Sequence, residues 1–214
     1  MPSPIDTIRA RSRLYGLLGA LLLDGFQGDG LETARLLPAL ADALPEGLDA
    51  DHLAARHHQA FGMGVPPYEG VLVGAEGHMG GDRAAAAADT LAATGLTERR
   101  TDVEADHLGL LLRASGFLCA AEADALTDGE DAAATELRAL QVRVLDGHLL
   151  PAWPMLSIAV DGLDLSEWSA VVGLAAALLA DHRQALPGEA ELALPEVPDG
   201  LLDDPKTGVK RIVA

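Results

Sequence analysis

The stretch that most constrains the fold is residues 101–118, because its second half is too apolar to lie in water. Thr101 and Glu104 have the spacing of a capping box, a pair of side chains that caps the first backbone N–H groups of a helix. A short acidic segment ending in His107 follows, and from Leu108 onward the residues are almost all apolar. We therefore expect a buried helix that begins at Thr101. Its titratable groups would stand at its start, where backbone N–H groups lack partners within the helix.

The rest of the chain also favours helices. Hydrophobic residues make up 49% of the sequence and aromatic residues only 3%, because most of the apolar residues are Ala and Leu, which are strong helix formers. We predict an all-α fold with a single compact domain of about eight helices over residues 1–186. One long Gly/Pro loop covers residues 62–81. An irregular tail covers residues 187–214, where repeated prolines preclude regular helix.

Caps, glycines and prolines predict where the helices begin and end. Pro38 should split a helical pattern over residues 31–44. Residues 148–154 should form a tight connection into a short helix at residues 155–160. Further helices are expected to begin at Ser3, at Asp49 or Asp51, at Asp82, at Thr127 (as a capping box with Glu130) and at Ser166, and to end near Asp24, Phe61, Gly95, Gly147 and Ala185.

Charge and cysteine content exclude several classes of function. With 15 Lys and Arg against 33 Asp and Glu, the net charge is −18, which disfavours nucleic acid and anionic membranes as partners. Cys119 is the single cysteine, so it has no intrachain partner, and its apolar neighbours predict a buried thiol. The apolar segment at residues 14–23 is too short to span a bilayer, and no signal peptide is evident. We expect a cytoplasmic protein without membrane insertion.

The usual signatures of catalysis and of metal or nucleotide binding are missing from the sequence. The glycines of residues 62–81 follow no βαβ pattern and are not joined by a phosphate-binding lysine. His52 and His57 would point about 140° apart on a helix, which is a poor arrangement for a shared metal ion. Asp106 and His107 would point about 100° apart and could not pair with each other. We predict no catalytic residue, no metal site and no cofactor.

Acidic and aromatic residues beside the loop suggest a different kind of site. Tyr68, Glu69, Glu104 and Asp106 could line one groove, together with Glu76. Carboxylates at the lip of a groove suit a peptide that carries arginine, because guanidinium and carboxylate form charge-assisted bonds. The same carboxylates could equally be solvated groups that stabilise a helix N-terminus. The residues alone leave both interpretations open.

Several short motifs then occur in a characteristic order. They are Pro-Pro-Tyr68-Glu69, an Ala-rich helix ending in Gly95-Leu96, Glu104-x-Asp106-His107 and the segment 148–153. In this order and spacing, roughly residues 10–185 resemble the TorD/DmsD/NarJ family, the dedicated cytoplasmic chaperones of molybdenum-cofactor oxidoreductases. Ala105 stands where the family usually has proline, and Gly70 stands where serine is common.

The resemblance implies an all-helical protein without catalytic activity or cofactor. Its members bind the twin-arginine signal peptide or the apo catalytic subunit of a molybdoenzyme, which aids cofactor insertion and prevents premature export. Carried onto this chain, the family's peptide-binding positions are Pro67, Tyr68, Glu69, Glu104, Asp106, His107 and Trp153.

Other hypotheses remain open from the sequence. The chain could be a general assembly factor that contacts a folded oxidoreductase subunit without binding a leader. A nucleotide-binding enzyme or a purely structural helical protein are further alternatives. A monomer and a dimer that exchanges elements through the long loop are both compatible with the sequence.

Overall fold

The computed structural model describes residues 3–44, 47, 49–96, 100 and 102–186. Within these ranges the chain is all-α, as predicted, and its only extended pairing is one isolated β-bridge. None of these described helices is long and apolar enough to cross a membrane. The expected tail at residues 187–214 lies outside the described residues.

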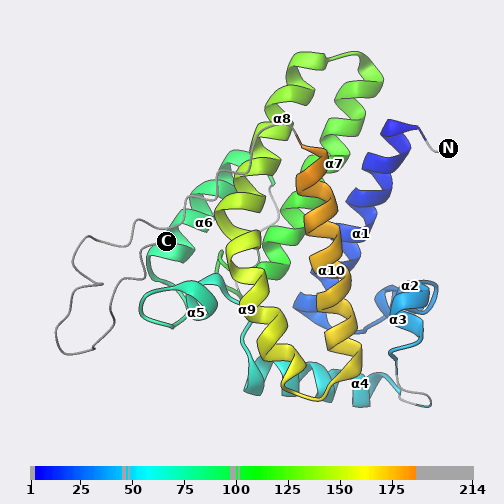
Figure 1. Ribbon diagram of the computed structural model, residues 1–214, viewed down its shortest axis with the longest axis vertical. Helices are drawn as coiled ribbons and strands as arrows, with labels where there is room; N and C mark the ends of the chain where they lie inside the picture. The colour runs from blue at the N-terminus through cyan, green and yellow to red at the C-terminus, as the bar shows by residue number, and fades with distance from the viewer. Residues whose placement is uncertain (1–2, 45–46, 48, 97–99, 101, 187–214) are drawn as a thin grey trace, which may run out of the picture.

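The centre of the fold is a pair of antiparallel helices, α1 (Pro4–Asp24) and α7 (Leu108–Asp128), which cross at glycines (Figure 1). A Cβ atom on Gly109 would lie 3.0 Å from the carbonyl oxygen of Gly19, and one on Gly116 would lie 3.0 Å from that of Ser12. Both distances are tighter than nearly all real Cβ contacts, and a Cβ atom on Gly19 would lie only 2.8 Å from the carbonyl oxygen of Gly109, so glycine at these positions lets the two backbones approach each other. The start of α7 consequently lies against the end of α1.

Three further helical segments pack around this pair. Helix α8 (Asp131–Val144) continues through a π-helical turn, η2 (Leu145–Leu149), into α9 (Leu150–Asp161). Helix α10 (Ser166–Ala185) returns beside α9 and α1, and Figure 1 shows it running between them. Trp168 of α10 is buried, and the centroid of its ring lies 4.9 Å from that of Phe26 and 4.8 Å from that of Phe61. This aromatic cluster anchors the peripheral segments to the core.

The peripheral segments between α1 and α7 are short, and they are α2 (Asp29–Arg35), α3 (Pro38–Ala41), α4 (Ala50–His57), the π-helical η1 (His58–Gly64), α5 (Glu69–Val73) and α6 (Gly81–Thr94). The predicted split at Pro38 is confirmed, because Pro38 begins α3. Asp49 caps α4 by accepting the N–H of His52. Arg56 of α4 pairs with the buried Glu167 of α10 through two hydrogen bonds, which ties this layer to the core.

Two cap predictions are confirmed at other places. Ser3 and Asp6 form a capping box at the start of α1, with Pro4 in the first turn. Gly95 ends α6 with a φ of +76°, a conformation that glycine adopts without strain. Cys119 is buried as expected, and burial raises the pKa of its thiol to about 12, which makes it an inert group.

Other predicted helix boundaries are wrong. Thr127 lies inside α7 and its hydroxyl donates to the carbonyl of Ala123, so it forms no capping box with Glu130. Ser166 is the first residue of α10, and its hydroxyl donates to the carbonyl of Ala43 in place of a cap. In both cases the hydroxyl donates to a backbone carbonyl, and such a bond competes with capping of the helix N-terminus.

The loop and the connection before α9 also differ from the prediction. The predicted loop at 62–81 contains the end of η1 and all of α5, so its irregular part is shorter than expected. Asp82 does not cap α6, because the cap position is Gly80. The predicted turn at 148–154 is helical, since Pro151 stands in the first turn of α9, where its missing N–H costs no helix bond.

Candidate functional site

The helix predicted from Thr101 begins only at Leu108. Its cap is His107, whose ring Nδ1 accepts the N–H of Gly109 at 3.0 Å. His107 also has extended backbone angles, and its own N–H donates to the carbonyl of Glu104 in a turn. Thr101 lies outside the described residues. The acidic segment therefore precedes α7 and does not form its first turn.

The acidic segment is held by a short antiparallel pairing with the loop before α5. Tyr68 and His107 form the β-bridge, and their rings lie edge to face with centroids 4.8 Å apart. The N–H of Glu69 donates to the carbonyl of Asp106, and the N–H of Leu108 donates to the carbonyl of Pro67. This pairing brings together two of the four motif segments found in the sequence.

Asp106 is completely buried and only partly satisfied. Its Oδ2 accepts the N–H of Gly70 at 2.9 Å, whereas its Oδ1 has no hydrogen-bond partner among the described residues. Burial raises the pKa of this carboxyl, and the nearby Glu69 and Glu104 raise it further, against the lowering effect of its backbone hydrogen bonds. Asp106 therefore does not stand at an open groove lip, where the sequence led us to expect it.

Glu69 is also completely buried, at a junction of three elements. One carboxylate oxygen accepts from Arg83 of α6 at 2.7 Å, and the other lies 2.7 Å from His148 of η2. The second ring nitrogen of His148 lies 3.0 Å from the hydroxyl of Thr90. Sequence reasoning missed Arg83 and Thr90, because no local spacing links them to Glu69. His148 was signalled only as the first residue of a motif segment.

Tyr68 and Glu104 are the parts of this arrangement that reach solvent. Glu104 is exposed and forms no ion pair with a described residue, and Tyr68 is half-buried. Burial raises the pKa of the Tyr68 hydroxyl, and Asp106, Glu104 and Asp102 raise it further. The carboxylates of Asp106, Glu104 and Asp102 therefore lie near this hydroxyl, and Asp102 is at the same time paired with Arg100.

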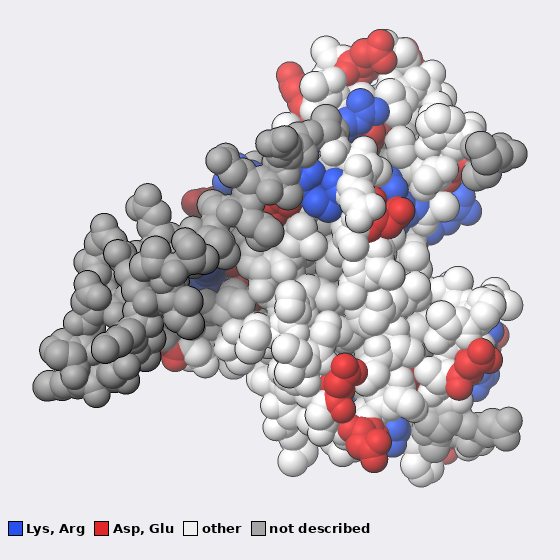
Figure 2. Space-filling model, viewed as in Figure 1, with Lys and Arg blue, Asp and Glu red and all other residues white. Residues whose placement is uncertain are grey.

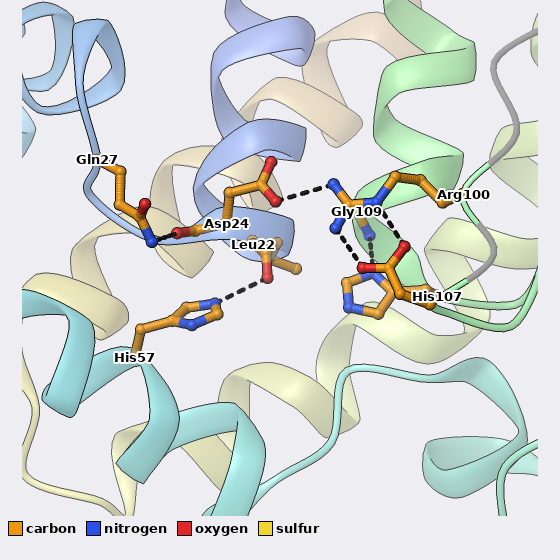
Figure 3. A network of polar contacts seen from close by, with 8 residues as sticks. Leu22, Asp24, Gln27, His57, Arg100, His107 and Gly109 are labelled. Carbon is orange, nitrogen blue, oxygen red and sulfur yellow. Dashed lines mark hydrogen bonds and ion pairs between the residues drawn. The ribbon is translucent and has the colours of Figure 1, made fainter.

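A charged network that the sequence did not predict lies behind His107 (Figure 3). Arg100 donates to Asp24 at the end of α1 and to Asp102, at 2.8 and 2.6 Å. The buried ring of His107 lies beside this network, and burial, with His57 and Arg100 nearby, lowers its pKa to about 4. His107 is therefore neutral near pH 7, and Nδ1 accepts the helix-capping bond while Nε2 carries the proton.

The last predicted site residue, Trp153, lies on α9, which packs against α5. Its ring is buried and its Nε1 donates to the carbonyl of Val172 at 3.0 Å. Trp153 and Pro154 line a small apolar groove of about 150 Å³ between α9 and α10. Met155 and Ile158 of the same helix are exposed to solvent.

Neither a metal site nor a set of catalytic residues emerges from this geometry. No group of three or more His, Cys, Asp or Glu side chains that could hold a metal ion occurs in the described part of the chain. His52 pairs with Asp49, and His57 bonds the carbonyl of Leu22, so the two histidines do not converge.

Comparison with known families decides the class. Residues 28–156 match the sequence model of a family described as the nitrate reductase delta subunit. The chain belongs to this nitrate reductase delta family. No curated protein and no solved structure matches the chain. The resemblance to TorD/DmsD/NarJ chaperones is thereby confirmed, and membership supports a general role as a molybdoenzyme maturation chaperone with a molybdoenzyme catalytic subunit as partner.

The part of the chain that matches the nitrate reductase delta family contains the whole candidate site. It extends from α2 into α9, so it includes both paired segments and Trp153. Helices α1 and α10 pack around it and lie outside the match. Asp24 of α1 still contributes to the site, because it accepts a hydrogen bond from Arg100. The family consists of maturation factors and not of catalysts.

Proposed function

We propose that this nitrate reductase delta family member binds the N-terminal twin-arginine leader of an apo molybdoenzyme catalytic subunit. Binding would take place in the cytoplasm before export, and it would hold the subunit until its cofactor has been inserted. The observation that carries the proposal is the antiparallel pairing of Tyr68 with His107, which leaves Glu104 exposed near the half-buried Tyr68 and without an ion pair to a described residue. A guanidinium group, with five N–H donors and a fixed positive charge, suits this surface.

Within this proposal the seven site residues have four different tasks. Tyr68 and Glu104 contact the leader directly, because they reach solvent. Pro67, Glu69 and His107 hold the pairing in place, since they are buried and already bonded. The remaining two residues are Asp106, which supplies buried negative charge and one free acceptor, and Trp153, which lines the apolar groove.

The energy of binding would come mostly from apolar contact. A solvent-exposed ion pair with Glu104 contributes roughly 0–1 kcal/mol. Burial of the leader's apolar segment contributes about 25 cal/mol per Å². The groove at Trp153 and the exposed Met155 and Ile158 offer apolar surface for that segment. The arginines then set specificity and orientation more than affinity.

Titration of the full chain with the leader peptide of a molybdoenzyme from the same genome tests this function. We expect binding that weakens when the arginine pair is replaced by lysines and weakens further when it is replaced by glutamines. Glu104→Gln should reduce affinity for the arginine leader. Glu136→Gln, on an exposed carboxylate of α8, is the matched control and should not. Equal affinity for the arginine and glutamine peptides would refute leader recognition at this surface.

The exposed apolar residues favour a second candidate, a general assembly factor. Met155 and Ile158 on α9 and Leu36 after α2 could contact a folded catalytic subunit without any leader. Capture of the leader-deleted subunit by the full chain, with no binding of the isolated leader peptide, would identify this alternative. Capture that requires the leader would support the first.

A further inference from the structure

A cleft of about 520 Å³ opens at the other end of the central helix pair, away from the acidic segment. It lies where α1 begins and α10 ends, and α7 and α8 form its remaining walls. Apolar side chains of Pro4, Ile8 and Leu186 line one part of it. Two guanidinium groups, of Arg11 and Arg138, line the other. The cleft has the size of a small-molecule site.

The charge of this cleft is unusual for so acidic a protein. In a chain of net charge −18, its charged lining residues are two arginines and a single carboxylate, Glu122. Figure 2 shows several Lys and Arg side chains in the upper half of the molecule, interspersed with Asp and Glu side chains. A negatively charged ligand would meet less electrostatic repulsion in this cleft than over most of the protein surface.

Arg11 is mostly covered by the fold, but its guanidinium group is not shut off from solvent. Its side chain is 10% exposed, and its one ion pair among the described residues is with Asp181, which is 76% exposed. A guanidinium group has five N–H donors, and one solvent-screened ion pair leaves donors of Arg11 that water or a ligand can reach. Because Arg11 lines the cleft, these donors can meet a ligand there.

Arg138 is held in place by a buried chain of side chains whose members are all bonded. Arg138 donates to one oxygen of Glu122 at 2.6 Å, and Gln141 donates to the other at 2.9 Å. The side-chain oxygen Oε1 of Gln141 lies 2.7 Å from Nε2 of His182, and Nδ1 of that ring lies 2.9 Å from the hydroxyl of Tyr15. Burial lowers the pKa of His182 to about 3, so the ring is neutral. Its Nε2 donates to Gln141, and its Nδ1 accepts from Tyr15.

This chain joins all four helices that wall the cleft. It fixes the direction of Arg138 before any ligand arrives, which reduces the ordering cost of binding. It also gives each oxygen of Glu122 a donor, so that this carboxylate is engaged by Arg138 and Gln141. The cleft therefore places two guanidinium groups among apolar side chains.

We infer that the cleft binds a small organic anion that has a carboxylate or phosphate group and an apolar body. The anionic group lies between Arg11 and Arg138, where it can accept charge-assisted hydrogen bonds. The apolar body lies against Ile8 and Leu186. The site is distinct from the proposed leader surface and does not depend on it.

Calorimetric titration of the full chain with four probes tests the inference. Octanoate and octyl phosphate carry both chemical features, octanol lacks the charge, and inorganic phosphate lacks the apolar body. We expect octanoate or octyl phosphate to bind at least about tenfold more tightly than octanol and inorganic phosphate, and their ratio tells carboxylate from phosphate. Octanol binding as tightly as both charged probes would overturn the inference.

Variants locate the site. Arg11→Gln should weaken octanoate and octyl phosphate binding about tenfold or more, whereas Arg13→Gln, on an exposed arginine of the same helix, should leave it unchanged. Thr7→Glu adds a negative charge at an exposed position of the cleft without disturbing a buried group, and it should weaken binding relative to Thr7→Gln. This second pair keeps the test valid if Arg11→Gln fails to fold. Equal affinities within both pairs would place the anion elsewhere.

Discussion

The two ends of the α1–α7 pair differ in the charge of the group that is incompletely paired. Where α1 ends and α7 begins, Asp106 is buried, and one of its carboxylate oxygens has no partner among the described residues. Where α1 begins and α10 ends, the mostly covered Arg11 has a single ion pair among the described residues, with the exposed Asp181. Arg11 and Asp24, which mark the two ends on α1, are about 20 Å apart at 1.5 Å per helical residue. In our two proposals, one rigid helix pair offers a cation site and an anion site that act separately.

Burial of an acid is not what distinguishes the two ends, because each end has a buried glutamate. Glu69 pairs with Arg83 and His148, and Glu122 pairs with Arg138 and Gln141. Both carboxylates are fully bonded and hold their surroundings together. The ligand that each end suits therefore depends on a different residue, Asp106 at one end and Arg11 at the other.

The largest effect should come from removing either buried glutamate. Glu69→Ala and Glu122→Ala should each lower the free energy of unfolding by about 1–3 kcal/mol, because each removes the ion-pair partner of an arginine and one hydrogen bond of a buried polar side chain, His148 or Gln141. Glu69→Ala should weaken leader binding, whereas Glu122→Ala should weaken octanoate binding. Urea unfolding followed by circular dichroism measures the first effect, and titration of the folded fraction measures the second.

Glu136→Ala is the control for both, since Glu136 is exposed and its removal should change stability by no more than about 0.5 kcal/mol. A loss below about 1 kcal/mol for either buried glutamate would contradict the role assigned to it. If each variant weakened both kinds of ligand equally, the two ends would not be independent.

Acidification should destabilise both ends from the same pH downward, because each end has a buried neutral histidine, and the two losses should level off at different pH values. The pKa values of His107 and His182 are lowered to about 4 and about 3, so the unfolded chain takes up these protons first as pH falls. Stability should be full above about pH 6.5 and decline below it, by roughly 3 kcal/mol for His107 by pH 4. Asp106 opposes this trend, because its raised pKa makes protonation favourable in the folded state.

Denaturant unfolding at a series of pH values measures how the free energy of unfolding changes with pH. His107→Gln should flatten it between about pH 6.5 and 4, and only the His182 contribution should persist below pH 4. His52→Gln, at an exposed position, should leave the profile unchanged. A profile in which His107→Gln and His52→Gln coincide would show that the pKa of His107 is not lowered in the folded protein.

The crossing of α1 and α7 supports both ends, so a change there should weaken both. A Cβ atom on Gly109 would lie 2.8 Å from a side-chain atom of Leu23 and 3.0 Å from the carbonyl of Gly19. Gly109→Ala should therefore cost about 1–3 kcal/mol through overpacking. Gly147→Ala is the matched control, because a Cβ there meets nothing within 4 Å, and it should be neutral or stabilising by up to about 1 kcal/mol. Thermal unfolding of the two variants compares them directly, and similar midpoints would mean that the crossing can relax.

The sequence predicted the helical class and the local breaks, since these depend on neighbouring residues. Pro38 splits a helix and Gly95 ends one for reasons of backbone geometry alone. The start of α7 could not be predicted in this way. His107 is extended because it pairs with Tyr68, and that pairing overrides the capping-box spacing of Thr101 and Glu104.

The sites were predictable only where a motif marked them. The acidic segment and the Tyr68 loop were recognised from residue types and order, but their burial was not, because burial depends on what packs over Glu69 and Asp106. No pattern in the sequence indicated the cleft. Arg11 and Asp181 are separated by 170 positions, and no local pattern joins Arg138 on α8 to the start of α1.

The smallest effect, and the one that separates stability from function, is expected for Asp106→Asn. The asparagine can keep the bond to the N–H of Gly70 while removing a buried charge that lacks a second partner. Because the pKa of Asp106 is raised, its ionised form is disfavoured in the folded protein, and the variant should be more stable at neutral pH by up to about 1 kcal/mol. The same change removes negative charge from the surroundings of Tyr68, so the arginine leader should bind more weakly while octanoate binding is unchanged.

Urea unfolding and the two titrations on Asp106→Asn measure these three quantities in one variant. A gain in stability with a loss of leader affinity means that the buried charge is kept for binding at the expense of folding, as is common at functional sites. A variant that is less stable yet binds the leader as before would show that Asp106 is purely structural. In that case the cation site would reduce to the exposed Glu104, whose single ion pair is too weak to discriminate arginine from lysine by itself.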